Sequence, residues 1–163
     1  MGKKGKKSDS AGRDIARNRR ATFDYEIGER FEAGVVLTGS EVKALRERGA
    51  ALGDAYVQFM GGEAWLIGVH IPEYAPAAAN GHDPMRTRKL LLHRKEIDKL
   101  GEGATQRGLT AVLMSLYFNK DGRVKAQIGL GKGKTRHDKR DAIREREDRR
   151  EADRAMKSAG RRR

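Results

Sequence analysis

Residues 109–130 read LTAVLMSLYF, NKDG and RVKAQIGL, which are two apolar runs joined by a four-residue turn. In the second run every other residue from Val124 to Leu130 is apolar, and a period of two is typical of a strand that buries one face. The Asp-Gly step in the turn favours a hairpin. The stretch therefore predicts two antiparallel strands, over residues 109–118 and 123–130.

Shorter extended segments precede this hairpin along the chain. Their patterns predict strands over residues 22–27, 31–37, 55–60, 63–71 and 90–92. Gly61-Gly62, between two of these segments, is typical of a two-residue hairpin loop. Helices are expected over residues 40–49, with Ser40 as the N-cap, and over residues 94–101, where Gly101 ends the helix.

The succession of hairpins indicates the fold class. No long crossover helix recurs between the strands, which favours an antiparallel sheet over a parallel one. A small sheet of this kind removes its exposed edges by closing into a barrel. We therefore expect a mainly β fold, a small antiparallel β-barrel of the oligonucleotide-binding (OB) type with two or three short helices, a flexible basic N-terminal arm and a C-terminal tail.

The positive charge gathers at the two ends of the chain. The sequence has 36 Lys and Arg against 23 Asp and Glu, a net charge of +13. Residues 1–20 and 132–163 carry this whole surplus, whereas basic and acidic residues balance over 21–131. We expect a flexible basic arm over 1–17, a barrel over 18–131 and a basic tail from residue 132 to residue 163. Two cationic ends on a neutral body favour a polyanionic partner.

The tail has the charge pattern of a helix but not the apolar residues of a packed one. Opposite charges recur at helical spacing, as in Glu145 with Arg149. Ile143 and Met156 are its only apolar residues larger than alanine. Such a segment is too poor in apolar surface to order itself by packing. We therefore expect the tail to be disordered when free and to fold on its partner.

Composition excludes several classes of protein. The chain holds no Cys, which excludes disulfides and thiolate metal sites. The apolar stretch over 109–118 is broken by Thr110 and Ser115 and is shorter than the roughly 20 residues of a membrane helix. The N-terminal lysines are not followed by the apolar segment of a secretory signal. We expect a cytoplasmic protein without a membrane partner.

The sequence offers weak signals for catalysis. Residues 129–135, GLGKGKT, end like a phosphate-binding loop, but that motif needs a glycine five residues before its Gly-Lys-Thr, where this chain has Ile128. We therefore interpret the glycines as a flexible hinge. His82-Asp83-Pro84 is interpreted as turn chemistry, with a catalytic dyad as the alternative. The four histidines show no paired ligand spacing. We expect no catalytic residue, no metal site and no cofactor, hence a binding protein and not an enzyme.

Aromatic residues occur on or near several predicted strands. Outward-facing rings could stack on the bases of a nucleic acid. For Phe23, Phe59 and Trp65 we expect a place in the core instead.

Six motifs follow one another along the chain. They are NRRA (18–21), FEAGVVLTGSEVKALR (31–46), GEAW (62–65), HDP (82–84), RTRKLLLH (86–93) and GKTRHDKR (133–140). Together they resemble the SmpB family, the SsrA-binding proteins of bacteria, from about Ala16 to Met156. Asp148 departs from the family pattern, because an aromatic residue is frequent there.

The resemblance implies an RNA-binding protein that binds the tRNA-like domain of tmRNA and delivers it to stalled ribosomes for rescue by trans-translation. The barrel would replace the anticodon stem, and the tail, helical on the ribosome, would probe the decoding centre and the empty mRNA channel. The partners implied are tmRNA (SsrA RNA), the ribosome with its small-subunit rRNA, and EF-Tu indirectly through charged tmRNA. The chain would act as a monomer, with one or two copies per tmRNA. A ribosomal or ribosome-assembly protein with an OB-like body remains the alternative.

The resemblance also implies site residues. On the side that faces tmRNA they are Asn18, Arg19, Arg20, Glu32 and Leu91. At the decoding centre they are His137, Asp138, Lys139 and Arg140, with Gly133 as the pivot before them. Ile143 and Met156 are expected to make the apolar contacts of the tail helix. For Glu32 the alternative role is to orient Arg30 or Arg46.

Overall fold

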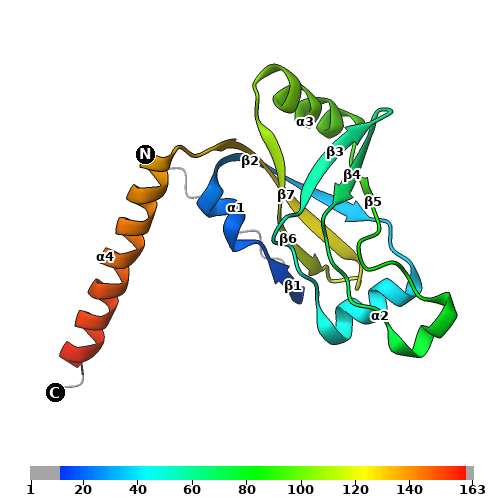
Figure 1. Ribbon diagram of the computed structural model, residues 1–163, viewed down its shortest axis with the longest axis horizontal. Coiled ribbons are helices and arrows are strands. Elements are labelled where there is room, and N and C mark those ends of the chain that lie inside the picture. Colours follow the sequence, from blue (N-terminus) through cyan, green and yellow to red (C-terminus); the bar gives the residue numbers. More distant parts are fainter. Residues whose placement is uncertain (1–11, 161–163) are drawn as a thin grey trace.

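The computed structural model describes residues 12–160 (Figure 1). Its elements are β1 (Asp14–Arg17), α1 (Arg19–Asp24), β2 (Tyr25–Val35), α2 (Gly39–Arg48), β3 (Tyr56–Met60), β4 (Glu63–Ile67), the short 3-10 helix η1 (Ala75–Asn80), β5 (Arg88–Leu91), α3 (Arg94–Gln106), β6 (Thr110–Phe118), β7 (Val124–Gly133) and α4 (Arg136–Gly160). Within the expected N-terminal arm, residues 1–11 lie outside the described part of the chain.

The seven strands form one antiparallel sheet that closes into a ring. Their order is β1-β6-β3-β4-β5-β2-β7, and β7 also pairs with β6. The predicted hairpins at 119–122 and at Gly61-Gly62 are confirmed as β6–β7 and β3–β4. The two glycines take the positive φ angles, 59° and 73°, that a tight hairpin loop requires. The predicted mainly β, antiparallel, barrel-like fold is confirmed.

The core fills the interior of this ring. Its large, fully buried strand residues include Leu66, Leu90, Leu113 and Ile128, one from each of β4 to β7. Leu45 of α2 and Leu100 of α3 belong to the same cluster. Burying one such side chain contributes about 1.5–3 kcal/mol to folding, so the core is what gives the outer face of the barrel a fixed geometry.

The first segments differ from the prediction. We expected order to begin at Asn18, but β1 already pairs with β6 over residues 14–17. The strand predicted over 22–27 is also wrong in its first half, because α1 occupies residues 19–24. Its cause is the Asn18 side chain, whose Oδ1 accepts from the Ala21 N–H and caps the helix. The alternation of apolar residues from Phe23 to Ile27 therefore crosses a helix end.

The N-cap of helix α2 lies two residues earlier than expected. Thr38, not Ser40, is its N-cap, and the Glu41 carboxylate accepts from the Thr38 N–H at 2.8 Å. Ser40 instead lies 2.9 Å from Nδ1 of the buried His82. Because the Ile71 carbonyl, 3.1 Å away, can only accept, His82 Nε2 donates to it and Nδ1 accepts from Ser40. His82 thus ties α2 to the loop before β5, which supports a structural role over a catalytic one.

A buried ion cluster joins α2 to β5. Glu41 and Arg88 are both fully buried, with Arg88 Nε 2.8 Å from Glu41 Oε1. Arg86 Nη2 lies 2.7 Å from Glu41 Oε2, and Arg88 also donates to the Val69 carbonyl. Burial by itself raises the pKa of Glu41, but donation by Arg86, by the Thr38 N–H and by Arg88 outweighs it and lowers this pKa to about 2. The carboxylate is therefore charged at neutral pH.

Helix α3 is longer than predicted. We expected it to end at Gly101, yet it continues to Gln106. Its buried face includes Leu100 and Gly103, and a Cβ on Gly103 would come within 2.4 Å of Leu130 Cδ2. The glycine here allows a helix to approach β7 closely, which local sequence signals do not reveal.

The glycines expected to form a hinge belong to β7. Gly129 and Gly131 pair with β2, and a Cβ on Gly131 would lie only 2.8 Å from Ile27 Cδ1. The strand extends to Gly133, so the barrel ends two residues later than the expected boundary at 131. Only Lys134 and Thr135 separate β7 from α4.

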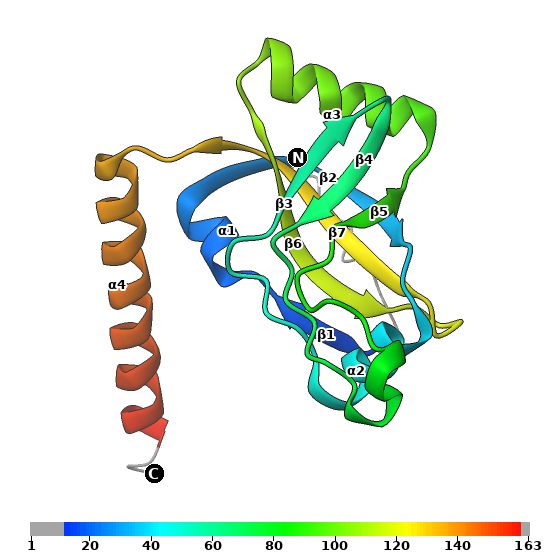
Figure 2. The same cartoon turned by 45° about the vertical axis from the view of Figure 1, so that its right-hand side comes forward.

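Helix α4 projects from the barrel as a separate arm (Figure 2). None of its residues is buried. The structure describes this tail as a helix, and the expectation that it is disordered in the free chain stays a prediction. Within residues 12–160 no helix is apolar over a length that would cross a membrane.

The three aromatic residues expected in the core have different places. Phe59 packs against the core, as predicted. Trp65 does not, because Ala64 and Leu66 on either side of it point inward and place its half-buried ring on the outer face of β4. Phe23 is half-buried on α1, where two cations of the tail lie over its ring.

Candidate nucleic-acid interface

One register row crosses five strands on the outside of the barrel. The residues paired along it are Leu91 (β5), Gly34 (β2), Lys125 (β7), Tyr117 (β6) and Asp14 (β1). Paired residues of a ladder place their side chains on the same face of a sheet. The row therefore brings Leu91 to the same face as the polar residues of β6 and β7.

A second row of paired residues lies beside the first and is shifted from it by two residues in β2, β7 and β6. It contains Glu32 (β2), Gln127 (β7), Ser115 (β6) and Arg17 (β1). We call the surface made by these two rows the polar face. Glu32 and Leu91, which are 59 positions apart in the sequence, both lie on it.

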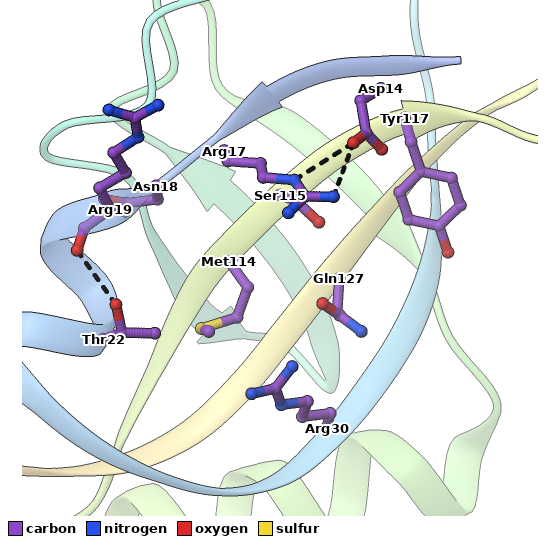
Figure 3. A pocket seen from close by; sticks show the side chains of 10 residues that line it. All are labelled: Asp14, Arg17, Asn18, Arg19, Thr22, Arg30, Met114, Ser115, Tyr117 and Gln127. Carbon is purple, nitrogen blue, oxygen red and sulfur yellow. Dashed lines mark hydrogen bonds and ion pairs between the residues drawn. The ribbon is translucent and has the colours of Figure 1, made fainter. Parts of the chain in front are cut away.

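A pocket of about 400 Å³ opens at one end of the polar face (Figure 3). Its lining residues are Asp14, Arg17, Asn18, Arg19, Thr22, Arg30, Met114, Ser115, Tyr117 and Gln127. Three guanidinium groups, from β1, α1 and β2, thus lie around one hollow that also offers two amides and three hydroxyls. The Arg17 guanidinium pairs with Asp14 at 2.8 Å. Guanidinium groups bind phosphate in bidentate fashion, and an amide can donate to and accept from a base edge.

The Asn18 side chain makes its hydrogen bonds within the protein. Its side chain is buried, Nδ2 donates to the Leu113 carbonyl at 3.0 Å and Oδ1 accepts from the Ala21 N–H at 3.3 Å. The residue therefore fixes the start of α1 on β6. By fixing this position, it places the exposed Arg19, the next residue, at the pocket.

Arg19 and Arg20 diverge. Arg19 lines the pocket, whereas Arg20 is 3.6 Å from Asp54 and 3.9 Å from Asp24. Arg20 borders another hollow, on the other side of α1. The structure thus brings Asn18, Arg19 and Glu32 together around one end of the polar face and sets Arg20 apart from them.

Glu32 is held by a residue that the sequence did not single out. The Tyr117 hydroxyl donates to its carboxylate, so neither of the alternative partners, Arg30 and Arg46, is the one it meets. Burial raises the pKa of Tyr117, and the hydrogen bond to the charged Glu32 raises it further. The phenol consequently remains a donor at any physiological pH. The period of two over 109–118 could have revealed it, because Ser115 and Tyr117 are polar members of one face.

Leu91 lies at the other end of the polar face. The residue is 56% exposed, whereas Leu90 is buried and Leu92 packs partly against the core. It borders a shallow groove of about 290 Å³ between β2, β5 and β7. An exposed leucine at the rim of a polar strip can cover the apolar face of a ribose or base.

Tyr117 offers a test of this arrangement. In a spectrophotometric titration, one of the four tyrosines should ionise well above the others, and Tyr117→Phe should remove that step. The variant should also lose about 1.5–3 kcal/mol of unfolding free energy, because one hydrogen bond to a charged group is lost. Tyr56→Phe, at an exposed tyrosine, is the matched control and should leave the late step in place. A late step that persists in Tyr117→Phe would contradict the contact.

The predicted decoding-centre residues fall in the first turns of α4. Asp138 Oδ2 accepts from the Thr135 N–H at 3.0 Å and from its hydroxyl at 2.7 Å, which caps the helix. These hydrogen bonds lower the pKa of Asp138. His137 lies 2.8 Å from Asp141, and Lys139 lies 3.2 Å from Asp24.

The remaining tail residues point to solvent. Arg140 is exposed, and Gly133 is the last residue of β7. Ile143 and Met156 are 43% and 68% exposed, as residues that await a partner would be. The structure therefore does not gather the predicted tail residues into one site.

Comparisons with known proteins give a consistent result. The family model described as "SmpB protein" matches residues 15–158. An SsrA-binding protein of Streptomyces avermitilis is 51% identical over 160 residues, which cover 98% of this chain and 90% of that protein. One of Leifsonia xyli subsp. xyli is 56% identical over 144 residues, 88% of this chain and 90% of that protein.

The barrel also has a counterpart among solved structures. A chain of the structure described as "tmRNA-SmpB: a journey to the center of the bacterial ribosome" superposes with a TM-score of 0.64 and 40% identity. The match covers 80% of this chain and 95% of that one.

Proposed function

The chain belongs to the SmpB family, and from this premise we propose how it performs the work of an SsrA-binding protein. It is an RNA-binding factor of trans-translation that binds tmRNA and delivers it to ribosomes, and it is not an enzyme. Its partners are tmRNA and the ribosome, so it acts in the bacterial cytoplasm. The observation that carries the proposal for the site is the polar face, because it unites Glu32 and Leu91 with a pocket of three guanidinium groups.

The polar face receives the tRNA-like domain of tmRNA. The residues of this face and its pocket include four basic and two acidic side chains, a surplus of positive charge on a barrel that is neutral over 21–131. Arg17, Arg19 and Arg30 meet phosphates of the RNA. A folded RNA is recognised largely by its shape and its 2′-hydroxyl groups, for which a rigid sheet with a few polar groups is well suited.

Glu32 needs a different role, since its carboxylate repels phosphate. Held by Tyr117, it accepts from a ribose hydroxyl or a base amino group. Asn18 acts through its position, because its hydrogen bonds fix the start of α1 and thereby aim Arg19 at the pocket. Leu91 covers an apolar patch of the RNA at the far end of the face.

The tail reaches the part of the ribosome that a stalled message leaves empty. Gly133 is the pivot, and His137, Asp138, Lys139 and Arg140 enter the decoding centre. Ile143 and Met156 supply the apolar contacts of the helix in the mRNA channel, because Asp148 offers no ring there. The absence of any buried residue in the described part of α4 supports a segment that finds its main binding surface elsewhere. The barrel takes the place of the anticodon stem. The protein acts as a monomer, with one or two copies on each tmRNA. EF-Tu joins the complex indirectly, through the charged tmRNA.

The RNA that the protein carries in bacterial cells tests this proposal. Affinity purification followed by sequencing of the bound RNA should recover tmRNA as the most enriched species. Charge reversal of Arg17, Arg19 and Arg30 to Glu should lower that enrichment about tenfold or more, since several phosphate contacts are lost. Reversal of Lys95, Lys99 and Arg107, which are exposed on α3 or at its C-terminal end, should not.

The alternative makes the opposite prediction. A ribosomal or ribosome-assembly protein would be present on all ribosomes in equal amount and would show no enrichment of tmRNA. That result would overturn the proposed function.

A further inference from the structure

Helix α1 is six residues long and has a different neighbour at each end. Its first residues border the pocket of the polar face, and its last two, Phe23 and Asp24, meet the tail. Figures 1 and 2 show α1 between the barrel and the first turns of α4. We infer that Phe23 and Asp24 are positioning residues that hold the start of the tail helix and direct it away from the RNA-binding face. The inference rests on the proposed function for its purpose.

We call the contact of Thr22, Phe23 and Asp24 with the start of the tail the joint. It begins in the backbone. The β2–β7 ladder extends to the pair Tyr25 and Gly133. One residue further along, the Lys134 N–H donates to the Asp24 carbonyl at 2.8 Å, and Lys134 Nζ donates to the Thr22 carbonyl at 3.1 Å. The chain therefore enters the tail while it is still hydrogen-bonded to the end of α1.

Side chains continue the joint over two turns of α4. Lys139 Nζ lies 3.2 Å from Asp24 Oδ1 and 5.9 Å from the centre of the Phe23 ring. The guanidinium carbon of Arg146 lies 5.5 Å from the same centre. Lys139 and Arg146 are seven positions apart, which places them on one face of a helix. One aromatic ring thus binds two cations of the tail at distances typical of cation–π contacts.

Contact with the barrel ends there. Beyond Arg146, no ion pair or cation–π contact joins the described part of α4 to another element. In both views the rest of the helix stands clear of the barrel. The joint therefore restricts the expected disorder of the tail to the residues that follow Arg146.

The positive charge of the tail explains why its start needs to be held away from bound RNA. Residues 132–163 carry fourteen basic and seven acidic residues, and they follow the barrel directly. A polyanion bound to the polar face would attract so cationic a segment, and a tail folded onto its own tmRNA would be lost for the ribosome. Contacts with α1 oppose that collapse. Being partly exposed and individually weak, they can also be given up when Lys139 reaches ribosomal RNA.

Distance measurements test the joint directly. The chain has no Cys, so Lys120→Cys and Glu145→Cys can carry two spin labels, both at exposed positions and the second within the segment that the joint holds. We expect a single narrow distance distribution in the free protein, which Phe23→Ala broadens. With tmRNA bound, Phe23→Ala should add a population at changed distances as the tail collapses on the RNA, whereas the parent protein should keep its distribution.

Two conservative variants separate positioning from mere packing. Phe23→Trp keeps an aromatic ring and should preserve the narrow distribution, while Phe23→Leu keeps apolar bulk without a ring and should behave like Phe23→Ala. In a reconstituted system, Phe23→Ala should slow tagging of stalled chains about threefold to tenfold, the size of a weak coupling between sites, with tmRNA affinity not reduced. Phe23→Trp should restore the rate.

The inference is overturned if Phe23→Ala leaves the distribution unchanged, or if Phe23→Leu preserves it as well as Phe23→Trp. A loss of tmRNA affinity in parallel with the tagging rate also overturns it. If the parent protein failed to bind tmRNA, the proposed function would fall, but the distribution in the free protein would still decide whether the joint exists.

Discussion

Removal of residues 134–163 is expected to abolish tagging of stalled chains while leaving tmRNA binding largely intact. The ring of strands closes through β6–β7 and β2–β7 and is complete at Gly133. None of the core residues belongs to α4, so the barrel keeps its fold and its polar face without the tail. The deleted segment has a surplus of positive charge, and its loss should weaken tmRNA binding by no more than about fivefold at physiological salt.

Gel-shift titration with tmRNA and a reconstituted tagging assay measure the two effects separately. A tail of the same composition in scrambled order is the matched control, since it retains the charge but not the order of His137 to Arg140. It should restore the lost affinity and not the tagging. Wild-type tagging by the truncated protein, or loss of tmRNA binding as complete as the loss of tagging, would refute the division of work between barrel and tail.

Glu41→Gln is expected to destabilise the barrel strongly. It leaves the guanidinium of Arg88, which is fully buried, without its carboxylate partner. Breaking one side of a buried ion pair costs about 3–5 kcal/mol. Chemical denaturation should show this loss, and Glu63→Gln, which breaks the exposed pair with Lys89, should cost less than about 1 kcal/mol.

The same cluster sets a pH dependence with a definite sign. The pKa of Glu41 is lowered from 4.5 to about 2 in the folded protein, so between these values the unfolded chain binds the extra proton. Stability from this group is complete above about pH 4.5 and is lost as the pH falls toward 2, by about 3 kcal/mol in all. Glu41→Gln should lack this part of the acid transition. An identical acid profile in both proteins would show that Arg86 and Arg88 do not hold the carboxylate.

What the sequence predicted well was local. The β6–β7 hairpin follows from alternation and a turn within 22 residues, and the β3–β4 hairpin follows from two glycines. Alternation failed at Phe23 to Ile27 because a capping asparagine starts a helix there. The hinge predicted at Gly129 and Gly131 was wrong, because glycine in a strand can also permit close packing, as it does here.

The parts that escaped prediction depend on residues far apart in the chain. Glu41 and Arg88 are 47 positions apart, and Glu32 and Tyr117 are 85 apart. No local pattern pairs such residues, because the register of the closed ring decides which of them meet. The motifs resembling the SmpB family indicated Glu32 and Leu91 as site residues, but only the register shows that they share one face.

Strand β1 has a practical consequence for anyone who purifies or immobilises this protein. It places Asp14 and Arg17 on the rim of the pocket, so a fusion joined directly ahead of this strand would lie beside the face proposed to bind tmRNA. Helix α4 leads away from the barrel (Figure 1), and a fusion after it would enlarge the segment proposed to enter the ribosome. A binding assay is therefore best served by a tag at the carboxyl end, a tagging assay by one at the amino end, and a comparison of the two by a protein from which every tag has been cleaved.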